Sequence, residues 1–422
     1  MSRNRITASG KERIHMKYNF DEIIDRRHTS CMNTDGFRQY IFHADENMKF
    51  PYADEEFIRM WIADMEFAAP DCITEGIKKR LSRKIFGYTR LFGDEYYKAF
   101  LAWTKKLYNW TFPQSDLYIS HGVIPALYEL TGYICKPGDK VLILTPSYAY
   151  FKYAAEYNDV EYVCADLLNR KQDGYYEMDF EDIRKKAADP AVKLCIFCSP
   201  HNPSGRIWTE EELRTFADIC LNNGLLIISD EIHCDLIRGG LTHTPLAKLY
   251  PDSDRLITCM APSKTFNTAG LQFSNIIIPN EDVRKLWLAR HNFDLNPLSL
   301  AGAQAAYEGG YDWMMELRQY LDANFEYVRD YLKEHLPEAV FRIPEATYLG
   351  WVDIKAYVEE GMDLPLFFAE KAGVLLEGGN MFVQNSDTYI RLNVACPRAV
   401  LSEGLTRICK ALNERKCDIS KV

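Results

Sequence analysis

Residues 192–233 read "VKLCIFCSPHNPSGRIWTEEELRTFADICLNNGLLIISDEIH", and their pattern indicates the fold class of the chain. The stretch begins with an apolar run suited to a buried strand, continues through a Pro/Asn/Gly loop, and ends with a second apolar run. Between the runs, Thr209 followed by Glu212 predicts a capped helix, and Gly224 predicts where that helix stops. Two apolar strands joined by a helix indicate a parallel sheet that helices cover on both faces.

The same alternation continues along the middle of the chain. Further apolar strands are predicted at residues 140–148, 255–264 and 274–279. The last third differs, because long helical patterns at 298–336 precede short strand-like segments such as "TYLGWVDI" and "YIRLNVAC". We therefore predict an α/β protein with a large domain, whose mostly parallel central sheet is flanked by helices, and a smaller α+β domain.

The predicted division of the chain has four parts. Residues 1–15 are expected to form a disordered extension, and residues 16–60 to pack with the small domain because they are too irregular to fold alone. Residues 61–297 are expected to form the large domain and residues 298–422 the small one. A length of 422 residues is consistent with more than one hydrophobic core.

Composition narrows the classes of partner. The chain has 50 basic and 60 acidic residues, and this net charge of −10 argues against a nucleic acid as the main partner. No apolar run reaches the roughly 18 residues that span a bilayer, and the N-terminus lacks the apolar core of a secretory signal. The twelve cysteines have neither a disulfide framework nor zinc spacing, and Cys195 and Cys198 fall inside a strand. We expect a cytoplasmic protein with reduced thiols that binds no metal, membrane or nucleic acid.

Polar side chains follow three of the predicted strands, namely Asn202, Asp230 and Lys264. The carboxyl ends of parallel strands meet at one edge, which is where open α/β sheets bind ligands. A fourth loop, "SHGVIPAL", leads into a helix with Pro125 in its first turn, and the free N–H groups of such a helix start suit a phosphate. An amine, a carboxylate, an amide and a phosphate cradle on one rim fit pyridoxal phosphate (PLP), whereas no nucleotide-binding motif is present.

At this point the sequence resembles the fold-type-I PLP enzymes of the class I/II aminotransferase family, and within them the cystathionine β-lyase-like branch of C–S lyases. The motifs that carry the resemblance run from about residue 20 to residue 398. They are "FDEIIDRRHT", "WIADMEF", "GYT", "SHGVIPAL", "CSPHNPSGRIWT", "SDEIHCDL", "APSKTFNTAGL" and "RLNVACPR". Each motif alone is weak, but their order and spacing together are specific.

The resemblance implies a role for each residue on the rim. Lys264 would form the Schiff base with the cofactor aldehyde and move the substrate Cα proton as general base. Asp230 would accept the pyridinium N–H, Asn202 would donate to the ring 3-oxygen, and His233 would bond the same oxygen or pack beside it. The other implied contacts are Tyr148 stacked on the ring, Gly122, Val123 and Ser263 at the phosphate, and Tyr88 reaching that phosphate from a neighbouring subunit of a homodimer. The alternatives are structural: a solvated lysine, a helix-capping aspartate and a tyrosine in a turn.

On the substrate side, the resemblance implies that Arg391 binds the α-carboxylate, for which a planar guanidinium is suited. The alternative is a structural arginine on an edge strand. The segment "WIADMEF", with Ala63 and Asp64, would line the substrate. Three positions depart from the family's pattern: Glu66 replaces an expected Asp, Ala261 replaces a frequent Ser, and Gln272 replaces a frequent Arg. The last two departures weaken the aminotransferase interpretation.

The favoured hypothesis is a PLP-dependent C–S β-lyase. It would cleave L-cysteine S-conjugates such as cystathionine to a thiol such as homocysteine, pyruvate and ammonia. An aminotransferase shares the Cα carbanion chemistry, and the sequence leaves the partition between the two reactions open. A third hypothesis is a regulatory protein that uses a PLP fold to bind a partner, although we expect no helix-turn-helix domain before residue 20.

Overall fold

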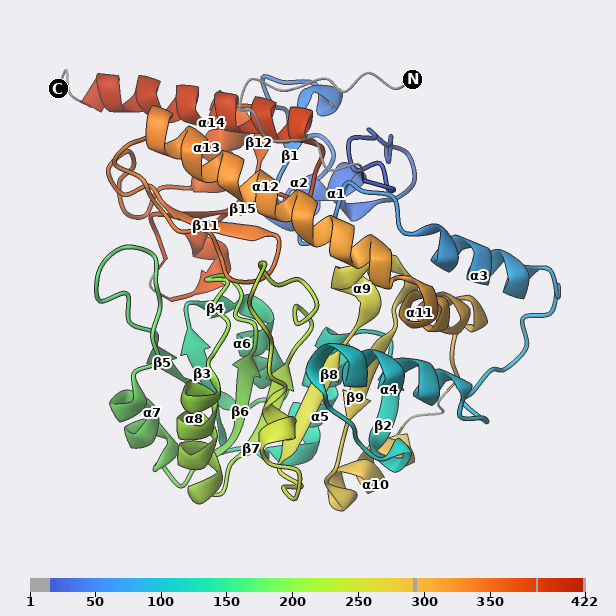
Figure 1. The fold of residues 1–422 in the computed structure, drawn as a ribbon. Coiled ribbons are helices and arrows are strands. Elements are labelled where there is room, and N and C mark those ends of the chain that lie inside the picture. Colours follow the sequence, from blue (N-terminus) through green and yellow to red (C-terminus); the bar gives the residue numbers. More distant parts are fainter. Residues whose placement is uncertain (1–15, 291–293, 385, 420–422) are drawn as a thin grey trace.

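The computed structural model describes residues 16–290, 294–384 and 386–419, so the extension expected at 1–15 lies outside the described residues. Its largest element is a seven-stranded sheet of order β2-β9-β8-β7-β6-β3-β5 (Figure 1). The five strands from β8 to β5 are parallel, whereas β9 is antiparallel to both of its neighbours. The strands are β2 (Leu117–Ser120), β3 (Lys140–Thr145), β5 (Glu161–Asp166), β6 (Val192–Cys198), β7 (Leu226–Asp230), β8 (Leu256–Met260) and β9 (Ser274–Ile277). The prediction of a mostly parallel central sheet is therefore confirmed.

Successive residues of each central strand enter two different cores, as the period of two of a strand requires. In β3, Leu142 packs under α7 (Phe180–Ala187) and α8 (Glu210–Asn222), whereas Ile143 joins the core beneath α5 (Val123–Ile134), α6 (Ala149–Glu156) and α10 (Glu281–Arg290). Cys195 and Cys198 divide between the same two cores as buried free thiols. Both faces of the sheet are covered, which explains why its strands are almost continuously apolar.

The helix between β6 and β7 begins and ends as its sequence predicts. Thr209 accepts a hydrogen bond from the Glu212 N–H at 3.2 Å, and the Glu212 carboxylate accepts one from the Thr209 N–H at 2.8 Å. Gly224 follows the helix at a φ of 79°, a left-handed conformation that favours glycine. This capped crossover places the ends of β6 and β7 side by side.

The second part of the molecule contains an antiparallel sheet of order β10-β11-β15-β13. Its strands are β10 (Val340–Phe341), β11 (Leu349–Asp353), β13 (Glu377–Gly378) and β15 (Tyr389–Asn393). The helices around it are α12 (Tyr311–His335), α13 (Leu364–Lys371) and α14 (Arg398–Ile419). This antiparallel sheet and the three helices around it form the predicted smaller α+β unit.

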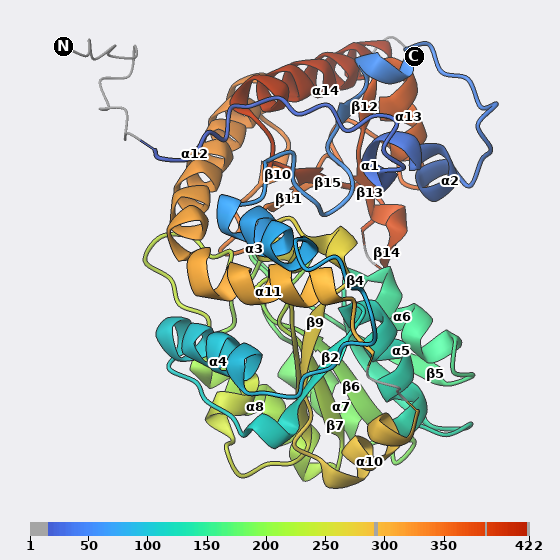
Figure 2. The same cartoon turned by 90° about the vertical axis from the view of Figure 1, so that its right-hand side faces the viewer.

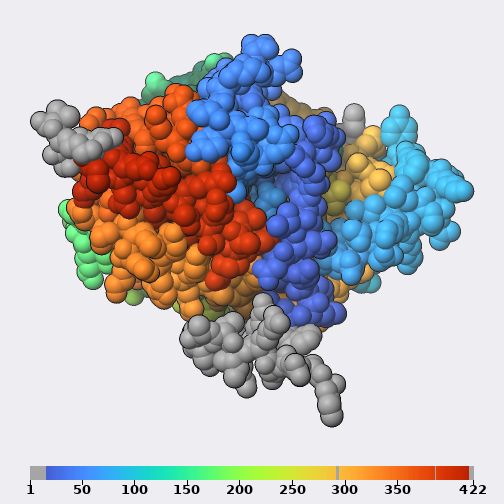
Figure 3. Space-filling model, turned by 90° about the horizontal axis from the view of Figure 1, so that it is seen from above, coloured from blue at the N-terminus to red at the C-terminus, as the bar shows by residue number. Residues whose placement is uncertain are grey.

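The N-terminal segment lies against this smaller unit. Strand β1 (Ile58–Arg59) pairs in parallel with β12 (Val374–Leu375), and α1 (Met32–Asp35) and α2 (Phe37–Phe42) lie beside α13 (Figure 2). Seen from above, the blue N-terminal segment lies alongside the red helix α14 (Figure 3). The exact boundaries of the four predicted parts stay a prediction.

A layer of three helices lies at the β2 edge of the large sheet. Helix α11 (Pro297–Gly309) packs on α3 (Asp71–Leu81) and α4 (Glu95–Tyr108) (Figure 2). The short elements β4 (Ser147–Tyr148) and β14 (Phe382–Val383) pair with each other and join the two units, and α9 (Pro262–Thr265) follows β8 directly. Among the described residues, no helix combines the length and apolarity needed to cross a membrane.

Candidate active site

The predicted rim residues meet around one cavity of about 500 Å³. Asn202 follows β6, Asp230 is the last residue of β7, and Lys264 lies in the short helix after β8. Because β6, β7 and β8 are adjacent and parallel, their carboxyl ends bring the three side chains together. The predicted site residues that also line this cavity are Ala63, Gly122, Val123, Tyr148, His233, Ser263 and Arg391.

Lys264 is held in place by a backbone carbonyl. Its Nζ donates a hydrogen bond to the Ala63 carbonyl at 2.6 Å, and the Tyr348 hydroxyl donates to the same oxygen at 2.7 Å. Burial above all, with a contribution from the Arg391 cation, lowers the pKa of the Lys264 ammonium. A lowered pKa increases the fraction of neutral amine, the form that acts as nucleophile or base. This environment differs from that of a solvated surface lysine.

Asp230 is a buried carboxylate that forms no salt bridge with any residue that the structure describes. Its Oδ1 accepts a hydrogen bond from the Ile232 N–H at 3.1 Å. Burial raises the pKa of Asp230 to about 7, against the opposing effects of that N–H and of Lys264. A protonated ring nitrogen beside this carboxylate would supply the missing positive charge.

His233 lies beside Asp230 and has unused hydrogen-bonding capacity. Its Nδ1 is buried and has no hydrogen-bond partner among the described residues. Burial, followed by the nearby Lys264 and Arg391 cations, lowers the pKa of His233 well below its usual value, so the ring is neutral. A neutral imidazole with a free ring nitrogen, a lysine with a lowered pKa and a buried carboxylate without a salt bridge among the described residues together fit PLP, which offers an oxygen, an aldehyde and a ring nitrogen.

The part of the cavity wall at the start of α5 suits a phosphate. Helix α5 begins at Val123, directly after Gly122, so the backbone N–H groups of its first turn are free to bind an anion. Ser263 also lines this cavity. Of the departures from the family's pattern, Gln272 lines the cavity, whereas Ala261 is buried in the core beneath α5.

Arg391 lies in β15 with 1% of its surface exposed, and its guanidinium has three polar partners among the described residues. Its Nη1 donates to Asn202 Oδ1 at 3.2 Å, and its Nη2 donates to the Trp61 carbonyl at 3.1 Å. The same Nη2 lies 2.5 Å from Glu377 Oε2. Glu377 was not singled out from the sequence, although a charged residue directly after the apolar run of "GVLLEGG" was a signal that could have found it.

Asp64 and Glu66 are not among the residues that line the cavity, and both form ion pairs with the N-terminal segment. Arg26 pairs with the Asp64 carboxylate at 2.5 Å and with Glu66 at 3.2 Å. The side chain of Asn33 donates to Glu66 at 2.6 Å. The longer side chain at position 66 therefore serves this cluster, and burial raises its pKa. A substrate contact by Asp64 stays a prediction, because Asp64 is not among the residues that line the cavity.

Tyr88 lies outside the cavity and is 94% exposed. It belongs to the loop between α3 and α4, together with the exposed side chains of Ile85, Phe86 and Phe92. Within this chain it contributes nothing to the site. Its predicted role requires a second subunit and stays a prediction.

Comparisons with known proteins agree with this geometry. The family model for aminotransferase class I and II matches residues 56–408. The chain is 40% identical over 360 residues to cystathionine beta-lyase PatB of Bacillus subtilis, covering 84% of this chain and 92% of that one. It is 31% identical to Protein MalY of Escherichia coli, covering 94% and 99%. Among solved structures, a PLP-bound C-S lyase from Staphylococcus hominis, complexed with L-cycloserine, superposes with a TM-score of 0.91 at 50% identity, covering 94% and 99%.

Proposed function

This chain belongs to the class I and II aminotransferase family, and from that premise we propose that it cleaves L-cysteine S-conjugates such as cystathionine by α,β-elimination. It is a PLP-dependent C–S lyase of the cystathionine β-lyase type. The observation that carries the proposal is the convergence of Lys264, Asp230, Asn202 and Arg391 on one cavity. The elimination breaks the bond between Cβ and sulfur, and water completes the balance to thiol, pyruvate and ammonia.

The cavity residues divide into those that would hold the cofactor and those that would hold the substrate. Lys264 would bind the aldehyde carbon, Asp230 the ring nitrogen, and Asn202 with His233 the ring 3-oxygen. The phosphate would lie at the start of α5, with Ser263 beside it, and Tyr148 would cover the ring. When bound, PLP supplies an electron-withdrawing ring that stabilises negative charge at the substrate Cα.

Lys264 would transfer the protons in this reaction. With its pKa lowered by burial, the amine is able to take the proton from the substrate Cα. The electron pair left at Cα then expels the sulfur from Cβ, and the Lys264 ammonium returns a proton to the departing thiolate. The Ala63 carbonyl accepts a hydrogen bond from Nζ at 2.6 Å and so holds the Lys264 amine in the cavity.

Arg391 would orient the substrate by binding its α-carboxylate through two parallel hydrogen bonds. Because Asn202 and the Trp61 carbonyl fix the guanidinium, the carboxylate would be held in one orientation relative to Lys264. Fixing the carboxylate also fixes which Cα bond faces the base.

The test is a product analysis of the purified holoenzyme without any keto acid. We expect cystathionine and S-methyl-L-cysteine to release thiol and pyruvate in equal amounts, and cystine to release pyruvate with cysteine persulfide as the leaving group. An aminotransferase would instead require a keto-acid acceptor and would release no thiol. A strict requirement for such an acceptor, or the absence of pyruvate, contradicts the proposal.

We also propose a cytoplasmic homodimer in which Tyr88 completes the phosphate site of the neighbouring subunit. The apolar side chains of Ile85, Phe86, Tyr88 and Phe92 are 71%, 57%, 94% and 88% exposed, and a cluster of this kind is typical of an interface. The twelve free cysteines suit a reducing compartment. Light scattering is expected to give twice the mass of one chain, and Tyr88→Phe to weaken PLP affinity without dissociating the dimer. A fully active monomer contradicts this proposal.

A further inference from the structure

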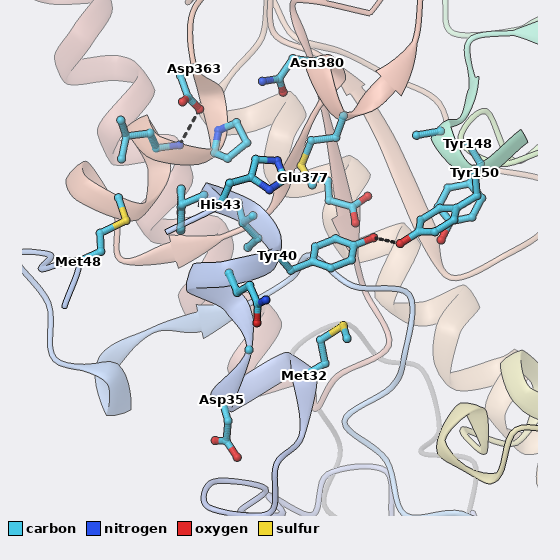
Figure 4. Close-up of a pocket in the computed structure, with 18 of the residues that line it drawn as sticks. Met32, Asp35, Tyr40, His43, Met48, Tyr148, Tyr150, Asp363, Glu377 and Asn380 are labelled. Carbon is cyan, nitrogen blue, oxygen red and sulfur yellow. Dashed lines mark hydrogen bonds between the residues drawn. The ribbon is translucent and has the colours of Figure 1, made fainter. Parts of the chain in front are cut away.

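A second cavity of about 980 Å³, here called the outer cavity, adjoins the active-site cavity. Five residues line both cavities, and we call them the passage residues: Met32, Tyr40, Tyr148, Tyr150 and Glu377. Figure 4 shows the Tyr40 side chain reaching toward Tyr150, with the Glu377 carboxylate close to the Tyr40 ring. The Tyr40 and Tyr150 hydroxyl groups are 3.5 Å apart. A group that leaves the active site on this side enters the outer cavity.

The outer cavity is acidic. The carboxylates that line it are those of Asp35, Asp363 and Glu377, and the described residues of its wall include no lysine or arginine. Among the described residues of the wall, only the imidazole of His43 is able to carry a positive charge. A cavity lined by one sign of charge favours a ligand group of the opposite sign. The ligand group expected here is therefore a cation.

Glu377 is the passage residue with the strongest electrostatic link to the substrate position. It pairs across the β13–β15 ladder with Arg391, and their carboxylate and guanidinium are in contact. A substrate α-carboxylate bound to Arg391 would therefore lie close to the Glu377 carboxylate. Two like charges at such a separation repel each other strongly in a buried site. A cation that approaches Glu377 from the outer cavity would offset this repulsion.

We propose that the outer cavity receives the thiol-bearing half of the substrate, and that Glu377 selects substrates whose leaving group carries an ammonium. This inference rests on the proposed function, because it takes Arg391 as the carboxylate site and Lys264 as the reacting group. In the free enzyme Glu377 is paired with Arg391. In the complex, the substrate α-carboxylate takes over the guanidinium, and the distal ammonium takes over Glu377.

The test uses two substrates of the same length and shape. S-(2-aminoethyl)-L-cysteine ends in an ammonium where S-propyl-L-cysteine ends in a methyl group. We expect the wild-type enzyme to favour the amine by at least about tenfold in kcat/KM, since a hydrogen bond to a charged group has that value. In Glu377→Gln the ratio falls to within about threefold, mainly through a higher KM for the amine. Equal kcat/KM values in the wild type, or an unchanged ratio in Glu377→Gln, would overturn the proposal.

A binding measurement separates this inference from the proposed function. L-lysine and L-2-aminoheptanoate have the same two shapes but no sulfur to expel, so their Kd values, from calorimetry on the holoenzyme, need no C–S cleavage. We expect the same tenfold preference for lysine, lost in Glu377→Gln and retained in Glu360→Gln, whose side chain is 72% exposed. If Glu377 only supports Arg391, the variant weakens both ligands equally, which overturns the inference. Absence of pyruvate from every substrate contradicts the proposed function alone.

Discussion

The rim of the large sheet and the passage to the outer cavity serve the same site but are built differently. The rim residues Asn202, Asp230 and Lys264 follow neighbouring parallel strands, so sheet topology alone brings them together. The passage residues come from α1, α2, the β4–α6 junction and β13, which meet only because the smaller unit packs on the larger one. The contrast suggests that the chemistry is set by local motifs, whereas substrate selection is set by the packing of remote segments.

The sharpest test of the rim is Lys264→Ala. Removal of the amine eliminates both the covalent link to PLP and the base at Cα, so we expect turnover to fall by at least about 10³-fold. The visible absorbance band of the lysine-linked cofactor is expected to disappear as well. Lys285→Ala is the matched control, because Lys285 is 64% exposed and pairs with Glu281 on the surface. Substantial activity in Lys264→Ala would remove the basis for treating the rim as the reactive part.

Asp230→Asn tests the second rim residue. Loss of the carboxylate removes the anion that would stabilise a protonated ring nitrogen, and we expect kcat to fall about 10²-fold. The expected loss lies mainly in kcat, since Arg391 and its partners still bind the substrate. A change confined to KM would instead place Asp230 on the substrate side of the cavity.

The same variant changes how the stability of the cofactor-free protein depends on pH. The folded-state pKa of Asp230 is about 7, above the usual value of 3.8, so between these pH values the folded protein binds more protons than the unfolded chain. The free energy of unfolding therefore falls as the pH rises from about 4 to 7, by up to about 4 kcal/mol from this group. Urea titrations at several pH values measure the slope, which Asp230→Asn is expected to reduce. An identical slope in both proteins would contradict a raised pKa.

The difference between rim and passage also explains what the sequence could predict. Apolar runs followed by polar residues identified β6, β7 and β8, the positions of Asn202, Asp230 and Lys264, and the capped helix α8. Glu377 also follows an apolar run, but its partner Arg391 lies in another strand, and the sequence does not show that the two residues form an ion pair. A substrate contact by Asp64 stays a prediction, and the pairing of its carboxylate with Arg26, 38 residues earlier in the chain, was not predicted. Such pairings depend on tertiary packing, which short motifs do not report.

Arg26→Ala tests whether the ion pairs between Arg26 and the carboxylates of Asp64 and Glu66 stabilise the folded protein. The substitution leaves the carboxylates of Asp64 and Glu66 partly buried without their cation, and we expect a loss of about 2 kcal/mol in the free energy of unfolding. Chemical denaturation measures it. Arg27→Ala is the matched control, because Arg27 forms an exposed pair with Asp25 and its loss is expected to leave the free energy of unfolding nearly unchanged. Equal losses in the two variants would mean that the cluster around Arg26 adds no stability beyond a surface pair.

The smallest expected effect belongs to Tyr150→Phe in the passage. The hydroxyl lost lies 3.5 Å from the Tyr40 hydroxyl, at the weak limit of a hydrogen bond, so the cost in stability is expected to stay below about 1 kcal/mol. Turnover of S-methyl-L-cysteine, whose leaving group is short, should change by less than about twofold, and that of cystathionine by slightly more. Tyr153→Phe, on the same helix but lining only the outer cavity, provides the comparison. A hundredfold loss with both substrates in Tyr150→Phe would place that hydroxyl in the proton transfer itself, and the division between a reactive rim and a selective passage would no longer hold.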